Sequence, residues 1–254
     1  MAAIVREAAL AGPRLIARSP LAFGAWVLLR IVEQYVTLSI LLGARQAGGA
    51  VAVGTVWSVL ASLPFEAVLI AALLRAALEP DAPKSAAFAY MRLGRIELRM
   101  AGVLVLAWLA GVVIALPSSI AVAYVGYGLQ QRVLAGSALT VGLAIAALAL
   151  MRFAPAPAIL VDEGRFDLGA AWRASRGRYL LLIVVILAAA AIERGLGEAG
   201  RMLIGPTGAT SWAALLQPLL LASIAWRSLV GVAAFAVMAG GVATVWRTSR
   251  QTLS

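Results

Sequence analysis

Long runs of apolar residues recur along the chain, and they constrain its fold more than any other feature. One of them is WVLLRIVEQYVTLSILLG, residues 26–43. A helix of about 20 residues crosses the ~30 Å hydrocarbon layer of a bilayer. Of the 254 residues, 63% are hydrophobic and 13% are charged, whereas a soluble domain is about half apolar and about a quarter charged. The sequence therefore predicts an all-α polytopic membrane protein, with residues 1–254 forming a single integral domain.

Six such segments are predicted to span the membrane. Basic residues concentrate in the N-terminal tail, in the second and fourth loops and at the C-terminus. Because cytoplasmic loops carry an excess of basic residues, both termini are expected in the cytoplasm. The abundance of Ala, Gly and Arg is typical of a GC-rich bacterium, so the expected location is the bacterial cytoplasmic (inner) membrane. The predicted spans are about 21–43, 55–78, 100–124, 137–157, 179–197 and 228–247.

The net charge of +10 would indicate nucleic-acid binding in a soluble protein. Here no basic run lies in a soluble region, so no nucleic-acid partner is expected. The expected partners are membrane lipids, especially anionic ones. A protein partner or a homo-oligomer is left open.

The second and fourth loops have helical patterns of their own. In the fourth loop, Asp167 is placed to cap a short helix that carries Leu168 and Trp172 on one face and Gly177 at its end. In the second loop, helical spacing relates Ala86, Ala89, Leu93, Ile96 and Met100. Both segments are predicted to be amphipathic helices on the inner leaflet. The arginines expected to contact anionic headgroups are Arg92, Arg95, Arg99, Arg173 and Arg176.

A third amphipathic helix is predicted over residues 3–17, interrupted at Gly12–Pro13. Arginines at positions 14, 95 and 176 are spaced by 81 residues. This spacing predicts three repeated units, each an amphipathic helix followed by a two-span hairpin. The apolar segment 211–226 is too short to cross the membrane. It is predicted either as an interfacial or re-entrant helix, which we favour, or as the outer extension of the last span.

The first two spans carry polar side chains that are costly in lipid. Arg30, Glu33 and Gln34 form a stripe on one face of the first span, and Ser62 and Glu66 lie on one face of the second. Glu33 and Glu66 are both about 18 Å from the inner ends of their predicted spans. Since consecutive spans are usually neighbours, Arg30 is expected to lie between the two carboxylates in a polar seam.

Two interpretations of this seam are kept. In the first, polar contacts simply hold the two spans together. In the second, the seam is a polar cavity for a headgroup, an ion or a proton. One arginine faces two glutamates, so one carboxylate lacks a full partner, and this is the strongest functional signal in the sequence.

Little in the sequence indicates catalysis. Cys and His are absent, which excludes disulfides, thiol chemistry and His-based metal sites or acid–base catalysis. Asp162 and Glu163 are adjacent acids, and they are interpreted as members of solvated salt bridges rather than metal ligands. We expect no catalytic residue, no metal and no cofactor. Ala236, Gly240 and Thr244 place small residues on one face of the last span, as close helix packing requires.

A recognisable motif occupies residues 151–182, MRFAPAPAILVDEGRFDLGAAWRASRGRYLLL. Its features are Arg152, Pro155, Pro157, Asp162, Ala171, Ser175, Arg176 and Gly177. In this region the chain resembles a poorly characterised bacterial six-span membrane family. A related module forms the membrane domain of some glycerophosphoryl diester phosphodiesterases. The resemblance implies a cytoplasmic-membrane protein of unknown or lipid-related role. It supplies no catalytic residues, since this sequence does not contain the soluble phosphodiesterase barrel.

The functional prediction is a non-enzymatic integral membrane protein that binds lipids or organises the membrane. The alternative is a transporter or channel for a small solute or lipid that uses the polar seam between the first two spans. An enzyme acting on lipid inside the membrane is disfavoured, because no pair of acids has a convincing spacing.

Overall fold

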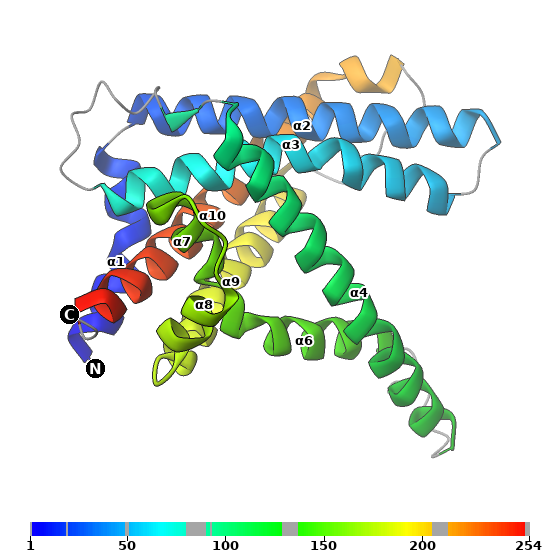
Figure 1. Cartoon of the computed structure of the whole chain (residues 1–254). Helices are drawn as coiled ribbons and strands as arrows, with labels where there is room; N and C mark the ends of the chain where they lie inside the picture. The colour runs from blue at the N-terminus through cyan, green and yellow to red at the C-terminus, as the bar shows by residue number, and fades with distance from the viewer. Residues whose placement is uncertain are drawn as a thin grey trace.

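The computed structural model describes residues 2–18, 20–48, 51–79, 90–91, 93–128, 137–204 and 213–251. This described part is all-α and contains no strand. Figure 1 shows the arrangement of the helices. In chain order they are α1 (Ala2–Arg18), α2 (Pro20–Gln46), α3 (Val51–Leu78), α4 (Arg95–Gly128), α6 (Ala138–Leu150), the 3-10 turn η2 (Met151–Phe153), α7 (Ala156–Glu163), α8 (Leu168–Ser175), α9 (Tyr179–Ile204), the 3-10 turn η3 (Ala213–Leu216) and α10 (Pro218–Gln251).

The prediction of an all-α polytopic fold with six spans is confirmed. Six helical segments of the described chain are long and apolar enough to cross a membrane. Most exceed the predicted limits: the third runs over Arg95–Gly128 and the sixth over Pro218–Gln251. The start of α1 and the end of α10 lie at the same end of the molecule (Figure 1), as an even number of crossings requires. We call this the terminal end, and the other the distal end.

Helix α10 is the central helix of the protein. In the most apolar stretch of 18 residues of α10, 78% of the residues are buried, whereas in that of α4 only 11% are buried. The predicted small-residue face is real: Ala236 and Thr244 are buried, and a Cβ on Gly240 would lie 2.7 Å from the Ala11 Cβ of α1. Such small residues let two backbones approach closely, which favours helix association in lipid.

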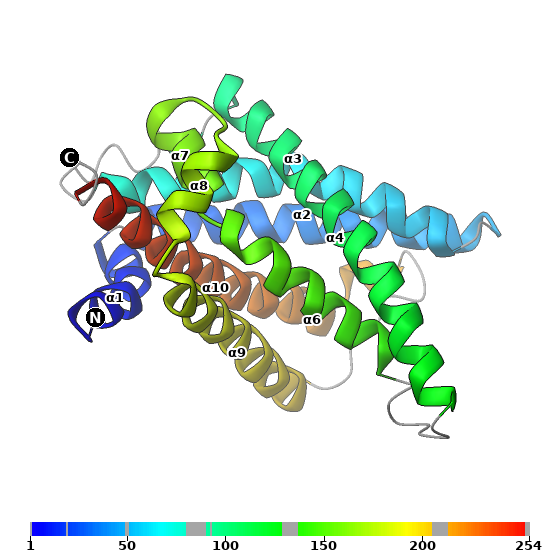
Figure 2. The same cartoon turned by 60° about the horizontal axis from the view of Figure 1, so that its bottom comes forward.

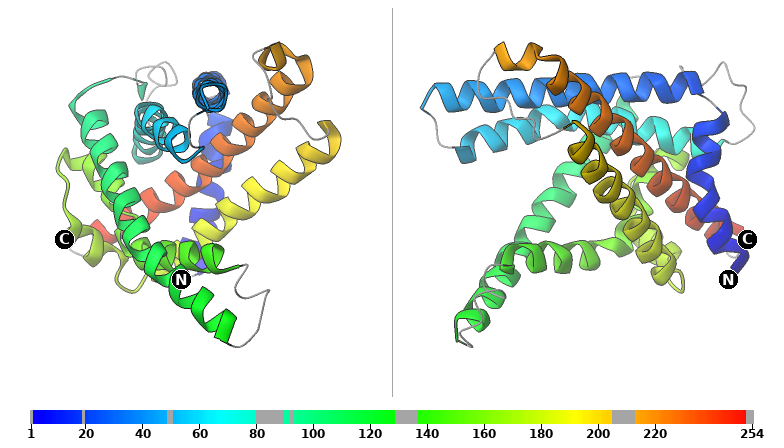
Figure 3. Two further views of the ribbon diagram at one scale, coloured as in Figure 1. Left: turned by 90° about the vertical axis from the view of Figure 1, so that its right-hand side faces the viewer. Right: turned by 180° about the vertical axis from the view of Figure 1, so that it is seen from behind.

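Helix α1 is continuous, so the predicted interruption at Gly12–Pro13 is wrong. The chain is α-helical from Ala2 to Arg18 with Pro13 inside the helix. Gly12 serves a different purpose, because a Cβ there would lie 2.6 Å from the Val237 Cα. The glycine therefore marks the crossing point of α1 and α10, which is visible from behind in Figure 3.

Helix α9 packs along α10 through the same kind of contact. A Cβ on Gly241 would collide with Val185, and a Cβ on Gly200 would collide with the Trp226 ring. The Trp226 Nε1 donates a hydrogen bond to the Leu196 carbonyl oxygen at 2.8 Å. The Trp226 contacts fix the distal half of α9 against the start of α10, and the Gly241 contact fixes the first half of α9 against the later part of α10.

The fourth predicted span, 137–157, is broken rather than continuous. Helix α6 ends at Leu150, η2 follows, and α7 begins after Pro155 and ends at Gly164 in the left-handed conformation (φ 69°). Figure 2 shows α6 lying beside α4. Helices α4 and α6 form an arm that contacts the remaining helices at its terminal-end base, through α3, α7 and η2.

The favoured interpretation of 211–226 is also wrong, and the alternative holds. Residues 218–226 form the first turns of α10, continuous with the last span. Before them, η3 packs Leu215 against Leu42 of α2, together with Leu220 and Ile224. Residues 211 and 212 lie outside the described part of the chain.

The amphipathic helix predicted over 86–100 does not form as one helix. Leu93 and Gly94 are not helical, and Arg95 and Met100 already belong to α4. Residues 80–89 and Arg92 lie outside the described residues. A short helix precedes a two-helix hairpin at α1–α3 and at α8–α10, but the middle unit is not comparable, so the threefold repeat stays a prediction.

The contact between Gly240 and α1 can be tested by adding one methyl group. Gly240→Ala should lower the thermal unfolding midpoint in detergent, because overpacking costs about 1–3 kcal/mol and outweighs a helix-propensity gain of about 1 kcal/mol. Gly102→Ala in α4 is the control, since a Cβ there has nothing within 4 Å; its midpoint should stay or rise. Equal shifts in the two variants would contradict the packing described here.

Candidate functional site

The structure brings Arg30, Glu33 and Glu66 together as the spacing predicts. Arg30 Nη1 forms ion pairs with the Glu33 carboxylate in its own helix and with Glu66 Oε1 of α3 at 3.2 Å. The Arg30 and Glu33 side chains are 15% and 6% exposed, whereas Glu66 is 28% exposed. The tightly buried partner is thus Glu33, and Glu66 is the looser carboxylate.

A third helix completes the surroundings of Arg30. Its guanidinium carbon lies 5.4 Å from the centroid of the Phe235 ring in α10, a geometry typical of a cation–π contact. Ser62 is not part of this group, because its hydroxyl donates to the Val59 carbonyl oxygen of its own helix at 2.9 Å. The seam therefore consists of one arginine and two glutamates, and Gln34 lines a neighbouring cavity instead.

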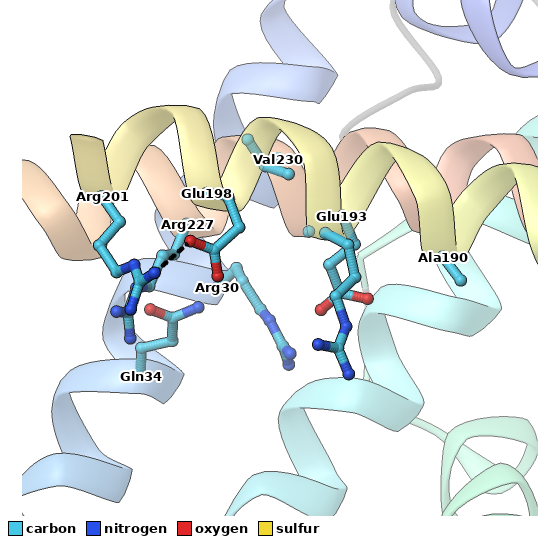
Figure 4. A pocket seen from close by; sticks show the side chains of 11 residues that line it. Arg30, Gln34, Ala190, Glu193, Glu198, Arg201, Arg227 and Val230 are labelled. Carbon is cyan, nitrogen blue, oxygen red and sulfur yellow. Dashed lines mark ion pairs between the residues drawn. The ribbon is translucent and has the colours of Figure 1, made fainter. Parts of the chain in front are cut away.

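A cavity of about 440 Å³ lies beside the seam, between α2, α9 and α10. Figure 4 shows Arg30 and Gln34 of α2 lying opposite Glu193, Glu198 and Arg201 of α9. The cavity residues are Arg30, Gln34, Ala190, Glu193, Arg194, Gly197, Glu198, Arg201, Arg227, Val230 and Gly231. We call this the distal cavity, because α9 reaches it in its last turns.

The charged groups of α9 in this cavity were not identified from the sequence as a site. Arg201 Nη2 forms an ion pair with Glu198 Oε2 at 2.7 Å. The fifth span is predicted to end at 197. Hydropathy alone therefore places Glu193 and Arg194 at its outer end and Arg201 in the loop that follows. The signal available was their spacing, since Arg194 and Arg201 are seven residues apart and thus share one helix face.

Basic residues also gather at the terminal end. Arg95 and Arg99 are exposed in the first turns of α4, and Arg99 Nη1 donates to the Gly164 carbonyl oxygen at 2.5 Å. This contact joins the start of α4 to the turn before α8. One of the arginines predicted to contact headgroups therefore already binds the protein, and Arg92 lies outside the described residues.

Helix α8 forms with the predicted cap. The Ala170 N–H donates to Asp167 Oδ1 at 2.8 Å, and Gly177 follows the helix with φ of 75°. This backbone hydrogen bond, aided by Arg165 and Arg173, lowers the pKa of Asp167 below its usual range. The carboxylate therefore keeps its charge, and continues to cap the helix, to a lower pH than an ordinary aspartate would.

The outer side of α8 combines basic and apolar side chains. Arg173 and Arg176 are exposed, as are Phe166, Leu168 and Trp172. With Arg95 and Arg99 these residues form what we call the basic end surface. Beneath it, the Arg152 guanidinium carbon lies 4.4 Å from the Trp172 ring centroid and 5.3 Å from that of Tyr179.

A buried ion pair that the sequence analysis missed joins α3 to α4. Arg75 Nη2 pairs with Glu97 Oε1, and the two side chains are 6% and 2% exposed. Arg75 Nη1 also donates to the Tyr90 carbonyl oxygen at 2.9 Å. The Tyr90 pKa is raised by burial and by the nearby Glu79 carboxylate. Arg75 lies near the end of the second predicted span, where the sequence shows no partner for it, and in the structure it joins α3 to α4.

Asp162 takes part in a polar contact between α7 and α10. Its Oδ2 accepts hydrogen bonds from Trp246 Nε1 and Arg250 Nη1, both at 2.8 Å. Glu163 pairs with Arg165 at 2.7 Å. Both acids have basic partners, as interpreted from the sequence. Among the described residues no group of three or more acids could hold a metal ion.

Comparison with known proteins gave no match to a family model, a curated protein or a solved structure. The resemblance of residues 151–182 to the six-span family therefore stays a prediction.

The seam can be tested by a double-mutant cycle in detergent. Arg30→Met should destabilise the protein, because it leaves the Glu33 and Glu66 charges without their partner. Adding Glu66→Gln should restore part of the loss, with a coupling of about 0.5–3 kcal/mol. The free energy of unfolding is measured by denaturant titration for the unaltered protein, for each single variant and for the double variant. Additive losses would show that Arg30 and Glu66 do not interact.

Proposed function

We propose that this integral membrane protein is non-enzymatic and that it binds anionic lipids of the bacterial cytoplasmic membrane through its basic end surface. The observation that carries the proposal is the combination of exposed Leu168, Trp172 and Arg173 on α8 with exposed Arg176 directly after it. Lipid headgroups supply the matching surroundings, since phosphates attract the guanidinium groups and the apolar side chains enter the acyl boundary.

Two features support a headgroup surface that is already formed. The buried side of α8, with Ala170, Ala171 and Ala174, packs against the protein, and the Asp167 cap holds its start. Arg173 therefore projects from a fixed helix, and Arg176 directly follows the last residue of that helix. With both termini in the cytoplasm, as the distribution of basic residues predicts, this surface lies at the inner leaflet, whose anionic lipids attract each cation by about 1 kcal/mol. The lipid-related role implied by the sequence resemblance agrees with this proposal.

Neutralising the basic end surface should weaken lipid binding. In Arg173→Gln/Arg176→Gln, affinity for phosphatidylglycerol should fall roughly fivefold for each arginine, as ~1 kcal/mol per cation implies. Native mass spectrometry of delipidated protein titrated with phosphatidylglycerol or phosphatidylcholine measures this. Arg45→Gln, an exposed arginine at the distal end of α2, should leave the affinity unchanged. Equal losses at both ends, or equal binding of the two lipids, would refute the proposal.

A second candidate function is transport of a small solute or lipid, and one arrangement favours it. Arg30 lines the distal cavity and also pairs with Glu66 of α3. Polar groups therefore continue from the cavity into the seam between α2 and α3. Such buried ionisable groups are typical of substrate and proton pathways in membranes.

Transport can be measured with protein reconstituted into vesicles. If the seam is a pathway, vesicles should show protein-dependent movement of fluorescent phospholipid or of protons, and Glu66→Gln should abolish it. Ser62→Ala, about one turn away with its hydroxyl bonded inside α3, should leave the rate unchanged. Absence of flux with the unaltered protein, or flux unaffected by Glu66→Gln, would rule out this second candidate.

A further inference from the structure

We propose that the distal cavity is a binding site for a phosphate group. It is formed by α2, α9 and α10, whereas the basic end surface is formed by α4 and α8. The proposal therefore goes beyond the proposed function, and each can fail without the other.

The charges of the cavity favour an anion. Among the described residues, its lining contains four arginines, at positions 30, 194, 201 and 227, and two glutamates, at positions 193 and 198. Glu198 already neutralises Arg201, and Arg30 is held by the seam carboxylates, so Arg194 and Arg227 face one remaining carboxylate of the lining, that of Glu193. In the part of the chain that the structure describes, no hydrogen bond or ion pair is formed by Arg194 or Arg227. Their guanidinium groups are therefore available to a ligand.

Guanidinium groups on two helices suit a phosphate in particular. Arginine donates two parallel hydrogen bonds to phosphate oxygens, and these charge-assisted bonds are stronger than neutral ones. Arg194 and Arg201 share one face of α9, and Arg227 comes from α10. Gln34 adds an uncharged amide from α2, on the opposite wall (Figure 4). A phosphate between these walls would meet donors from three helices.

The size of the cavity indicates more than a bare ion. Its volume of about 440 Å³ is within the range of about 300–1,000 Å³ of small-molecule pockets. Two glycines on its walls leave this space free of side chains. A Cβ added at Gly231 would lie 3.8 Å from Arg30 Nε, and a Cβ added at Gly197 would have no neighbour within 4 Å. There is room for a phosphate together with the group that carries it.

The phosphate can come from a lipid headgroup or from a phosphorylated solute. Helices α2 and α9 each pack against α10, and they share no extensive contact with each other. Leu196 and Leu229, next in sequence to the lining residues Gly197 and Val230, are 45% and 42% exposed. An acyl chain therefore has apolar surface beside the cavity. The two sources present the same chemistry to the arginines, and the experiment below separates them.

Two glycines of α9 provide a matched pair of variants. Gly197→Phe should fill the cavity without changing its charge, because a side chain there meets open space. Gly195→Phe introduces the same residue into the same helix, also with nothing within 4 Å, but Gly195 does not line the cavity. Comparison of the two separates a blocked site from a general effect on α9. Arg227→Gln removes one unpaired cation from the opposite helix.

The probes are inorganic phosphate and short-chain phosphatidic acid, added to delipidated protein in a nonionic detergent and followed by calorimetry and native mass spectrometry. At least one probe should bind at one site per chain that is distinct from any binding of phosphatidic acid to the basic end surface. The affinity at this site should fall roughly tenfold or more in Arg227→Gln, as loss of charge-assisted hydrogen bonds implies, and in Gly197→Phe, because the ring occupies the cavity. It should stay unchanged in Gly195→Phe and in Arg173→Gln/Arg176→Gln.

Binding of phosphatidic acid alone would identify a lipid headgroup, and competition by inorganic phosphate would identify a free phosphate source. Failure of both probes to bind, or binding that Gly197→Phe leaves intact, would overturn the site. Loss of binding only in Arg173→Gln/Arg176→Gln would assign it to the basic end surface instead.

Discussion

The close approach of α1 and α9 to α10 is the constraint on which the rest of the structure depends. Apolar side chains gain nothing by leaving lipid for a helix interface, so association needs backbone proximity or polar contacts. Gly12, Gly240 and Gly241 supply that proximity. Because α9 is seated on one side of α10 and α2 on another, a space remains between them, and the distal cavity occupies it.

Ion pairs then fix how the hairpins are joined. Arg30 links α2 to α3 through Glu66, and Arg75 links α3 to α4 through Glu97. Removing one member of such a buried pair is strongly destabilising, because the other charge is left in a medium that cannot solvate it. These pairs therefore fix how far each helix is shifted along its neighbour, whereas contacts between apolar surfaces alone would allow several such positions.

The sequence was sufficient for the six spans and for the seam, because helical spacing and depth along a span decide both. It was insufficient for Arg75 and Arg194, since basic residues near a span end are ordinarily assigned to headgroups, and only packing between helices reveals a buried partner or a shared cavity. The same limit explains Gly12, where a turn signal in the sequence proved to be a helix crossing. The continuity of 218–226 with the last span was underestimated because a tryptophan at the end of an apolar segment ordinarily marks the membrane interface, whereas Trp226 donates a hydrogen bond to α9.

The arm formed by α4 and α6 joins two helices of unequal length. At 1.5 Å per residue, the 34 residues of α4 extend about 51 Å and the 13 residues of α6 about 20 Å. The first exceeds a ~30 Å hydrocarbon layer, whereas α6 reaches a sufficient length only together with η2 and α7, which continue the same apolar segment to Glu163. A bilayer accommodates a long helix by tilting it and a short one by thinning locally. Helix α4 is therefore expected to cross the bilayer at a tilt, and a thicker membrane would require a smaller tilt of the arm.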